Sequence, residues 1–358
     1  MIKNSGQAGI SINASRGGNN LIIAVSQSLA GYGTLNSFID YIFNGAPDKI
    51  TAMARRCRII VNAPDAGGDT RGTLNNGRAL NGGREAMPDE LIDGISSFLF
   101  IDFFRQAERS GGGIDAAAGP ALKTAGASID YSGIKFGIEY EDDFLAVINK
   151  PAGVKIHSDG TGASDSLSDA VDNYFRRAFC GARAYPVHRL DIGTSGLIVF
   201  AKDNITCAIL DRAIYENRLL RRYTAVIEGA PAAREGSINL AIGRDRHNSN
   251  RYRVSKTGKT AVTGYKVIKI DRRRNISFIE ATLASGRTHQ IRVHFSHIGH
   301  PLAGDTLYGG RPLKSRDFFA LASASDTERE FLLHSSYLYF IHPYSKKTIE
   351  LNSPPDFM

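Results

Sequence analysis

The residues best suited to chemistry lie near the middle of the chain, where His188, Arg189 and Asp191 stand close together. The turn that follows, residues 193–196, is rich in Gly, Ser and Thr and could bring backbone amides close to a substrate. An apolar run at 198–201 then predicts a buried strand. Asp191 is therefore expected on an exposed loop just before a core element, where catalytic groups are often held. A structural salt bridge to Arg189 is the alternative.

Two later segments carry groups that could serve this carboxylate. Residues 221–229 predict a strand whose two-residue alternation points Tyr223 inward, either as packing or as a site residue. Arg221 and Arg222 precede it, and their charge favours phosphate nearby. Farther on, Arg287 stands at a glycine turn where an alternating element starts, a position well suited to pairing with a carboxylate.

Several histidines in the same region suggest a metal site, and a metal-dependent hydrolase is one hypothesis. His289 and His294 do not have the spacing of a helical ligand pair, and no acidic third ligand follows at a familiar distance. The three cysteines, Cys57, Cys180 and Cys207, form no CxxC arrangement. We therefore expect reduced cysteines and no bound metal.

Composition limits the class of protein. A chain of 358 residues with 42% apolar residues predicts about two globular domains. A net charge of +8 favours a polyanionic partner, although a merely basic protein has the same composition. No apolar run approaches the ~18 residues of a membrane helix. We expect a cytoplasmic monomer with no membrane partner.

The first third of the chain is the least informative. Residues 1–33 are rich in Gly, Asn and Ser and predict a poorly ordered leader or an added edge strand. Residues 34–110 predict a small accessory domain, with a helix at 35–42 capped by Thr34 and a second basic helix at 53–58. This pattern is similar to a degenerate S-four-like RNA-binding domain, with an unrelated small domain as the alternative.

A linker is expected next, at 111–130, and the catalytic domain at 131–358. The acidic run at 139–143 is interpreted as a solvated hairpin tip. A Pro and Gly turn should bring Lys150 and His157 to a surface edge.

Five segments in order resemble the RluA family of RNA pseudouridine synthases, over about Lys135 to Pro355. They are IEYEDDFLAVINKPAGVKIH at 138–157, HRLDIGTSGL at 188–197, RRYTAVIEG at 221–229, SGRTHQIRVHFSHIGHPLAGDTLYG at 285–309 and LLHSSYLYFIHP at 332–343. The resemblance implies an α+β fold with a mixed, largely antiparallel β-sheet around a central cleft. It implies cofactor-free isomerisation of specific uridines, in ribosomal or transfer RNA with an accessible uridine, to pseudouridine. The predicted accessory domain, a small N-terminal α/β unit, lies outside the resemblance.

The resemblance also implies roles for single residues. Asp191 matches the catalytic carboxylate, which could attack the sugar, attack the base or remove a sugar proton. Tyr223 matches a tyrosine that contacts the base and is a candidate for removing the C5 proton. Arg287 matches the arginine that pairs with the catalytic carboxylate, and Arg189 one that helps to fill the space left by the flipped base. Further RNA-contact candidates from these motifs are Lys150, His188, Thr194, Leu197, Arg222, Thr288, Gln290 and Arg292.

Basic stretches outside the motifs fit an RNA partner. One is a predicted hairpin or loop with Arg244, Arg246, Arg251, Arg253, Lys256 and Lys259, in which Tyr252 could stack on a base. The other is the turn at 272–274. A charge run is commonly just a solvated face. An RNA-binding protein that keeps the fold without catalysis is the second hypothesis.

Overall fold

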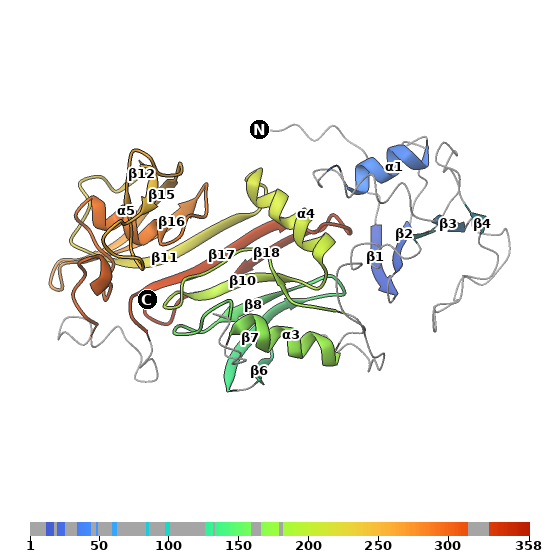
Figure 1. The fold of residues 1–358 in the computed structure, drawn as a ribbon, viewed down its shortest axis with the longest axis horizontal. Coiled ribbons are helices and arrows are strands. Elements are labelled where there is room, and N and C mark those ends of the chain that lie inside the picture. Colours follow the sequence, from blue (N-terminus) through green and yellow to red (C-terminus); the bar gives the residue numbers. More distant parts are fainter. Residues whose placement is uncertain are drawn as a thin grey trace.

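The computed structural model describes residues 12–17, 20–25, 34–43, 48, 59–62, 84–85, 97–100, 126–131, 133–158, 166–178, 182–313 and 329–358. These residues form a five-stranded sheet near the N-terminus, an eleven-stranded sheet in the rest of the chain and a separate two-stranded hairpin (Figure 1). None of the helices described is both long and apolar enough to cross a membrane.

The large sheet runs in the order β12-β15-β16-β11-β17-β10-β8-β7-β6, with β18 paired to β17 and β9 to β10. Its strands are β6 (Ser128–Tyr131), β7 (Ile134–Glu141), β8 (Leu145–Lys150), β9 (Tyr185–Pro186), β10 (Ser195–Ala201), β11 (Leu220–Glu228), β12 (Glu235–Asn239), β15 (Val262–Asp271), β16 (Ile276–Leu283), β17 (Leu333–Ile341) and β18 (Thr348–Asn352). β10 pairs in parallel with β17, and the other pairs of this sheet are antiparallel. The predicted mixed, largely antiparallel sheet is confirmed.

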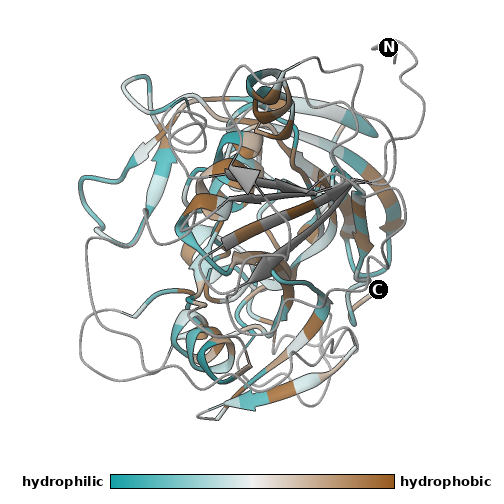
Figure 2. Cartoon of the chain, turned by 90° about the vertical axis from the view of Figure 1, so that its right-hand side faces the viewer, coloured by the Kyte–Doolittle hydropathy of each residue, from teal (hydrophilic) through white to brown (hydrophobic). Residues whose placement is uncertain are grey.

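The central strand β10 is buried on both faces, which explains its continuous run of apolar residues. Alternation sends Ile198 and Phe200 into one core, and Leu197 and Val199 into another. The helix α3 (Leu167–Ala178) packs on the side of Ile198 and Phe200, and α4 (Asn204–Tyr215) packs on the side of Leu197 and Val199. The helices visible in Figure 2 carry both brown apolar and teal polar residues, as expected for elements with one face against a sheet.

Smaller elements complete the half of the sheet that holds β11. The helix α5 (Gln290–His297) contacts β15, the 3₁₀ turn η3 (Thr306–Tyr308) and the strand β14 (Tyr252–Val254). β14 pairs with β13 (Ile242–Arg244), so the predicted basic hairpin is confirmed. α5 places Ile291 and Phe295 in the main core.

The N-terminal sheet has the order β1-β2-β5-β3-β4 and contains only antiparallel pairs. Its strands are β1 (Ile12–Gly17), β2 (Asn20–Val25), β3 (Ile59–Asn62), β4 (Arg84–Glu85) and β5 (Ser97–Phe100). Part of the stretch expected to be a poorly ordered leader is therefore a β-hairpin, with β1 at the edge of the sheet. The alternation of apolar residues in β2, with Leu21 and Ile23 buried, accounts for this.

The predicted helix at 35–42 is confirmed as α1 (Leu35–Ile42), with the Thr34 hydroxyl accepting a hydrogen bond from the Ser37 amide. The second basic helix, expected at 53–58, lies outside the described residues. At the C-terminal end of α1, the Lys346 ammonium donates to the Ile42 carbonyl, and Phe43 packs edge-on against Tyr344 at 6.3 Å. α1 thus contacts the turn between β17 and β18. β6 begins at Ser128, inside the range expected to be linker.

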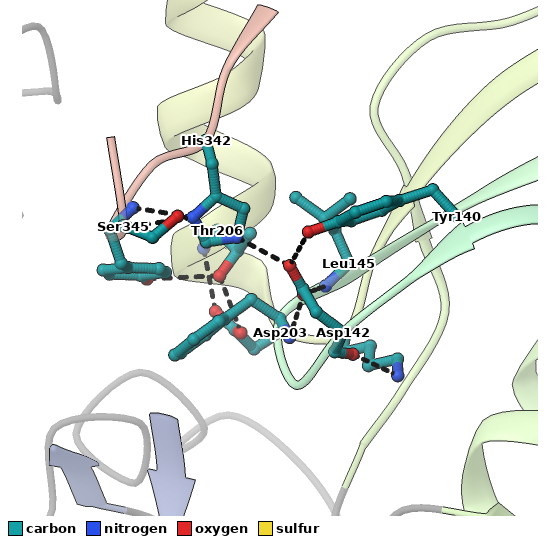
Figure 3. A network of polar contacts seen from close by, with 10 residues as sticks. Tyr140, Asp142, Leu145, Asp203, Thr206, His342 and Ser345 are labelled. Carbon is teal, nitrogen blue, oxygen red and sulfur yellow. Dashed lines mark hydrogen bonds and ion pairs between the residues drawn. The ribbon is translucent and has the colours of Figure 1, made fainter. Parts of the chain in front are cut away.

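The acidic run at 139–143 is not a solvated hairpin tip, and that prediction was wrong. Glu141 is buried and pairs with Lys202 at 3.1 Å. Asp142 accepts hydrogen bonds from the Tyr140 hydroxyl at 2.6 Å and pairs with His342 at 2.9 Å (Figure 3). The partners come from distant parts of the chain, so this turn closes a buried polar network at one end of the sheet.

Candidate active site

A cleft of about 460 Å³ brings together most of the residues singled out in the sequence. Its walls come from the turn before β10, the end of α4, the start of β11 and the segment that leads from β16 into α5. Nine predicted residues line it: His188, Arg189, Asp191, Thr194, Tyr223, Arg287, Thr288, Gln290 and Arg292. Segments more than 100 residues apart therefore converge on a single hollow.

Asp191 lies on the loop between β9 and β10, as predicted, and its side chain is 15% exposed. The loop is fixed from both sides. The Thr194 amide donates to the Asp191 carbonyl at 3.0 Å, and the Gly153 amide donates to the Ile192 carbonyl at 2.9 Å. These backbone bonds hold the carboxylate against the cleft before any ligand arrives.

Arg292 is the basic partner of Asp191, with Nη1 3.6 Å from Oδ2. The same guanidinium donates from Nε and Nη2 to both oxygens of Asp305, at 2.7 and 2.8 Å. It lies between two rings, 4.2 Å from the centre of Phe331 and 5.0 Å from that of Tyr308. A bidentate carboxylate and two aromatic faces thus fix the position of the charge that faces Asp191.

The ion pair expected between Arg287 and Asp191 is not found, and Arg292 takes that place. Arg287 is exposed on the cleft wall, and its Nε donates to the Thr260 carbonyl at 3.0 Å. The start of α5 explains the difference. The helix begins at Gln290, whose side-chain oxygen accepts from the Arg287 amide at 3.0 Å, so Arg287 precedes the helix while Arg292 lies on its buried first turn.

Tyr223 lies on β11 with its side chain turned inward, as the alternation predicted, and it is 4% exposed. Burial raises the pKa of Tyr223, while the positive charge of Arg221 opposes the shift. The hydroxyl therefore keeps its proton at neutral pH. It can donate a hydrogen bond into the cleft, and it becomes a base only after that proton has left.

His188 anchors the loop that carries Asp191. Its Nε2 accepts a hydrogen bond from the Val199 amide at 3.3 Å, which requires that this nitrogen carry no proton. Burial lowers the pKa of His188 to about 3, and the charge of Arg221 acts in the same direction. The imidazole is therefore neutral and ties the loop to β10.

Lys150 does not lie at a surface edge, and it does not line the cleft. The side chain is fully buried, and Nζ donates to the carbonyls of Pro151, Val154 and Ile192 at 2.8, 2.7 and 3.0 Å. Burial lowers its pKa to about 7, against the effect of the negative charge of Asp191. Lys150 supports the Asp191 loop from behind, so its expected contact with RNA is not available.

Two more of the predicted RNA contacts lie away from the cleft. Leu197 is fully buried in the core under α4. Arg222 lies on the face of β11 opposite Tyr223, where it stacks over the Tyr337 ring at 4.1 Å and pairs with Glu280 at 3.5 Å. Arg221 and Tyr223, the sequence neighbours of Arg222, line the cleft, but strand alternation turns the Arg222 side chain to the other face of β11.

Residues that the sequence did not assign to this site also frame it. His289 adopts a left-handed conformation, with φ 56°, just before α5, and its Nδ1 shares a hydrogen bond of 2.8 Å with the Tyr308 hydroxyl. Asp305 and Tyr308 belong to the motif at 285–309, and that membership is the sequence signal that could have identified them as site residues. Phe331 stands outside every motif and packs against Gly193, where an added Cβ would lie 2.8 Å from its ring.

The basic hairpin β13–β14 adjoins the cleft. The Tyr252 amide donates to the Tyr308 hydroxyl at 2.9 Å, and the Arg251 guanidinium lies 5.5 Å from the centre of that ring. The remaining basic residues of the hairpin, Arg244, Arg246, Arg253, Lys256 and Lys259, are exposed. In the turn at 272–274, Arg274 pairs with Asp271 at 2.8 Å. Among the described residues, no three side chains of His, Cys, Asp or Glu gather in a way that could hold a metal.

Comparison with known proteins identifies the class. Residues 144–297 match the family model described as RNA pseudouridylate synthase. YhcT of Bacillus subtilis strain 168, named an uncharacterized RNA pseudouridine synthase, is 39% identical over 217 residues, which are 61% of this chain and 68% of that protein. Ribosomal large subunit pseudouridine synthase D of Zymomonas mobilis is 36% identical over 226 residues, which are 62% of this chain and 69% of that protein.

Among solved structures, human RNA Pseudouridylate Synthase Domain Containing 1 is similar, with a TM-score of 0.47 and 24% identity. The match covers 62% of this chain and 84% of the human chain. On the strength of the sequence relatives, the chain belongs to the RluA family of RNA pseudouridine synthases. It is thus an isomerase that acts on RNA.

Proposed function

We propose that this enzyme converts specific uridines of ribosomal or transfer RNA to pseudouridine, with Asp191 as the catalytic carboxylate. The observation that carries the proposal is the convergence of Asp191, Tyr223 and Arg292 on one cleft, with Arg292 3.6 Å from the Asp191 carboxylate. Arg292 places a fixed positive charge beside this carboxylate, which must be ionised to attack or to accept a proton.

The reaction requires no external group. It breaks the bond between N1 of uracil and C1′ of ribose, forms a bond between C5 and C1′, and exchanges the hydrogen on C5 for one on N1. Substrate and product are isomers, so nothing is oxidised or reduced. Side chains can supply the necessary charge and proton transfers, and we propose a site that works without a cofactor.

The target uridine must leave its stack to reach Asp191. Unstacking costs a few kcal/mol and is cheapest in loops and single strands, which favours a structured RNA with an accessible uridine. Arg189 is exposed on the cleft wall and can occupy the space that the flipped base leaves. Tyr223 contacts the uracil ring, and its raised pKa supports this contact role over that of the base that removes the C5 proton.

Ribosomal RNA is the first target to test, because several relatives are named ribosomal large subunit pseudouridine synthase D. Pseudouridine should be mapped in ribosomal and transfer RNA from cells with and without the gene. In parallel, the purified protein should release tritium from RNA that contains C5-tritiated uridine. RNA binding without tritium release from any of these RNAs would instead indicate a binding protein that no longer catalyses.

A further inference from the structure

We propose that Arg221 is an anchor for a backbone phosphate of the substrate RNA inside the cleft. The inference rests on the proposed function, because it concerns the same site and the same substrate. In the sequence, charge alone favoured phosphate near both Arg221 and Arg222, and the structure turns only Arg221 into the cleft.

Arg221 is 5% exposed and lines the cleft two residues before Tyr223, on the same face of β11. Its Nε has no hydrogen-bond partner. No carboxylate of the described residues lies within 4.0 Å of its guanidinium, and none of these residues accepts a hydrogen bond from it. A buried cation therefore faces the cleft without a counter-ion from the part of the chain that the structure describes.

Such an arrangement is costly in a free protein. A charge removed from water is normally paired or hydrogen-bonded, because burial otherwise raises its free energy substantially. Arg292 in the same cleft is as buried as Arg221, but it is paired, because Asp305 accepts hydrogen bonds from it through both carboxylate oxygens. The unpaired state of Arg221 is explained if its counter-ion arrives with the ligand.

The geometry favours phosphate as that counter-ion. A guanidinium presents paired N–H groups that match phosphate oxygens, and RNA carries one phosphate for each nucleotide. The terminal nitrogens of Arg221 lie beside Gly286, where an added Cβ would be 3.5 Å from Nη1 and 3.8 Å from Nη2, so no side chain at position 286 stands between them and the cleft. A nucleotide flipped toward Asp191 brings its flanking phosphates into the same cleft.

The test compares Arg221→Met with wild type in two measurements. RNA affinity at low salt should fall about 10- to 100-fold, and the slope of log affinity against log salt should decrease by about 1, as for one lost phosphate contact. The melting temperature of the free protein should stay the same or rise, because a buried unpaired charge is removed. A lower melting temperature with an unchanged salt slope would show that Arg221 is only structural and would overturn the proposal.

Arg176→Met is the matched control, because Arg176 pairs with Asp172 at 2.8 Å on α3, outside the cleft. It should change neither the RNA affinity nor the salt slope. If Arg221→Met does not fold, Arg221→Lys keeps the charge. It should retain the wild-type salt slope with weaker binding, and a reduced slope in this variant would contradict the proposal.

Methylphosphonate substitutions then identify the phosphate. Replacing phosphates one at a time near the target uridine should reveal one position that weakens wild-type binding and leaves Arg221→Met unaffected. Equal loss in both proteins at every position would overturn the assignment. Tritium release by the wild-type protein is measured on the same unmodified RNA, so a failure of the proposed function is seen separately from a failure of this contact.

Discussion

The two ends of β10 bury polar groups in opposite ways. After the strand, Lys202 pairs with Glu141 at 3.1 Å. The Asp203 carboxylate accepts from the Thr206 hydroxyl at 2.8 Å (Figure 3). Before the strand, the Thr194 hydroxyl is 2% exposed and has no partner, and the nearby Arg221 has no counter-ion among the described residues. We expect the end after the strand, here called the satisfied end, to stabilise the fold, and the end before it, the unsatisfied end, to bind a ligand.

Removing one partner at the satisfied end should produce the largest loss of stability. Lys202→Met leaves Glu141 buried without its cation, so the free energy of unfolding should fall by about 3 to 5 kcal/mol. Urea unfolding measures this change, and kcat of the folded variant should stay close to wild type. A loss below about 1 kcal/mol would mean that water or another group takes the place of the lysine, and that Glu141 is not left buried without a partner.

Lys150 provides a pH-dependent test, because it is a buried lysine at the end of β8 beside the Asp191 loop. Burial lowers its folded-state pKa from 10.5 to about 7. Between these values the unfolded chain holds a proton that the folded chain has lost, so the contribution of Lys150 to stability rises with pH from about 7 to 10.5.

Lys150→Met should abolish this contribution. The difference in unfolding free energy, wild type minus variant, should increase with pH across that window, with a slope of up to ~1.4 kcal/mol per pH unit. Lys347→Met, at an exposed lysine, is the control and should give a constant difference. A flat difference for Lys150→Met would show that the three carbonyl acceptors keep the ammonium charged throughout.

The smallest effect is expected in a direct comparison of two buried threonines. Thr206→Val at the satisfied end removes the hydrogen bond to Asp203 and should cost about 1 to 2 kcal/mol of stability. Thr194→Val removes a hydroxyl without a partner, so stability should change by less than about 0.5 kcal/mol, while KM for RNA rises. Equal losses of stability for the two variants would remove the distinction between the ends.

Local patterns in the sequence were enough to place Asp191. The glycine turn and the apolar run after it fixed a loop before a buried strand, and strand alternation turned Tyr223 inward. The helix α1 and its Thr34 cap also followed from spacing within a few residues. These predictions depend on neighbours along the chain, which is why they succeeded.

Predictions that depended on distant partners failed. Asp142 was assigned to solvent because its partner His342 lies 200 residues away in the sequence. Arg287 was paired with Asp191 because both belong to motifs, but the starting point of α5 decides which arginine enters the cleft. The absence of a counter-ion for Arg221 among the described residues depends on which side chains surround it in the folded protein. The spacing of residues in the sequence does not predict these neighbours.

The central claim is that Asp191 carries out the chemistry of this cleft. Asp191→Asn keeps the size of the side chain and removes its charge, so the fold and the RNA affinity should change little. Single-turnover assays on C5-tritiated RNA should show no tritium release by this variant, at protein concentrations where the RNA is fully bound. Release at the wild-type rate would contradict the account.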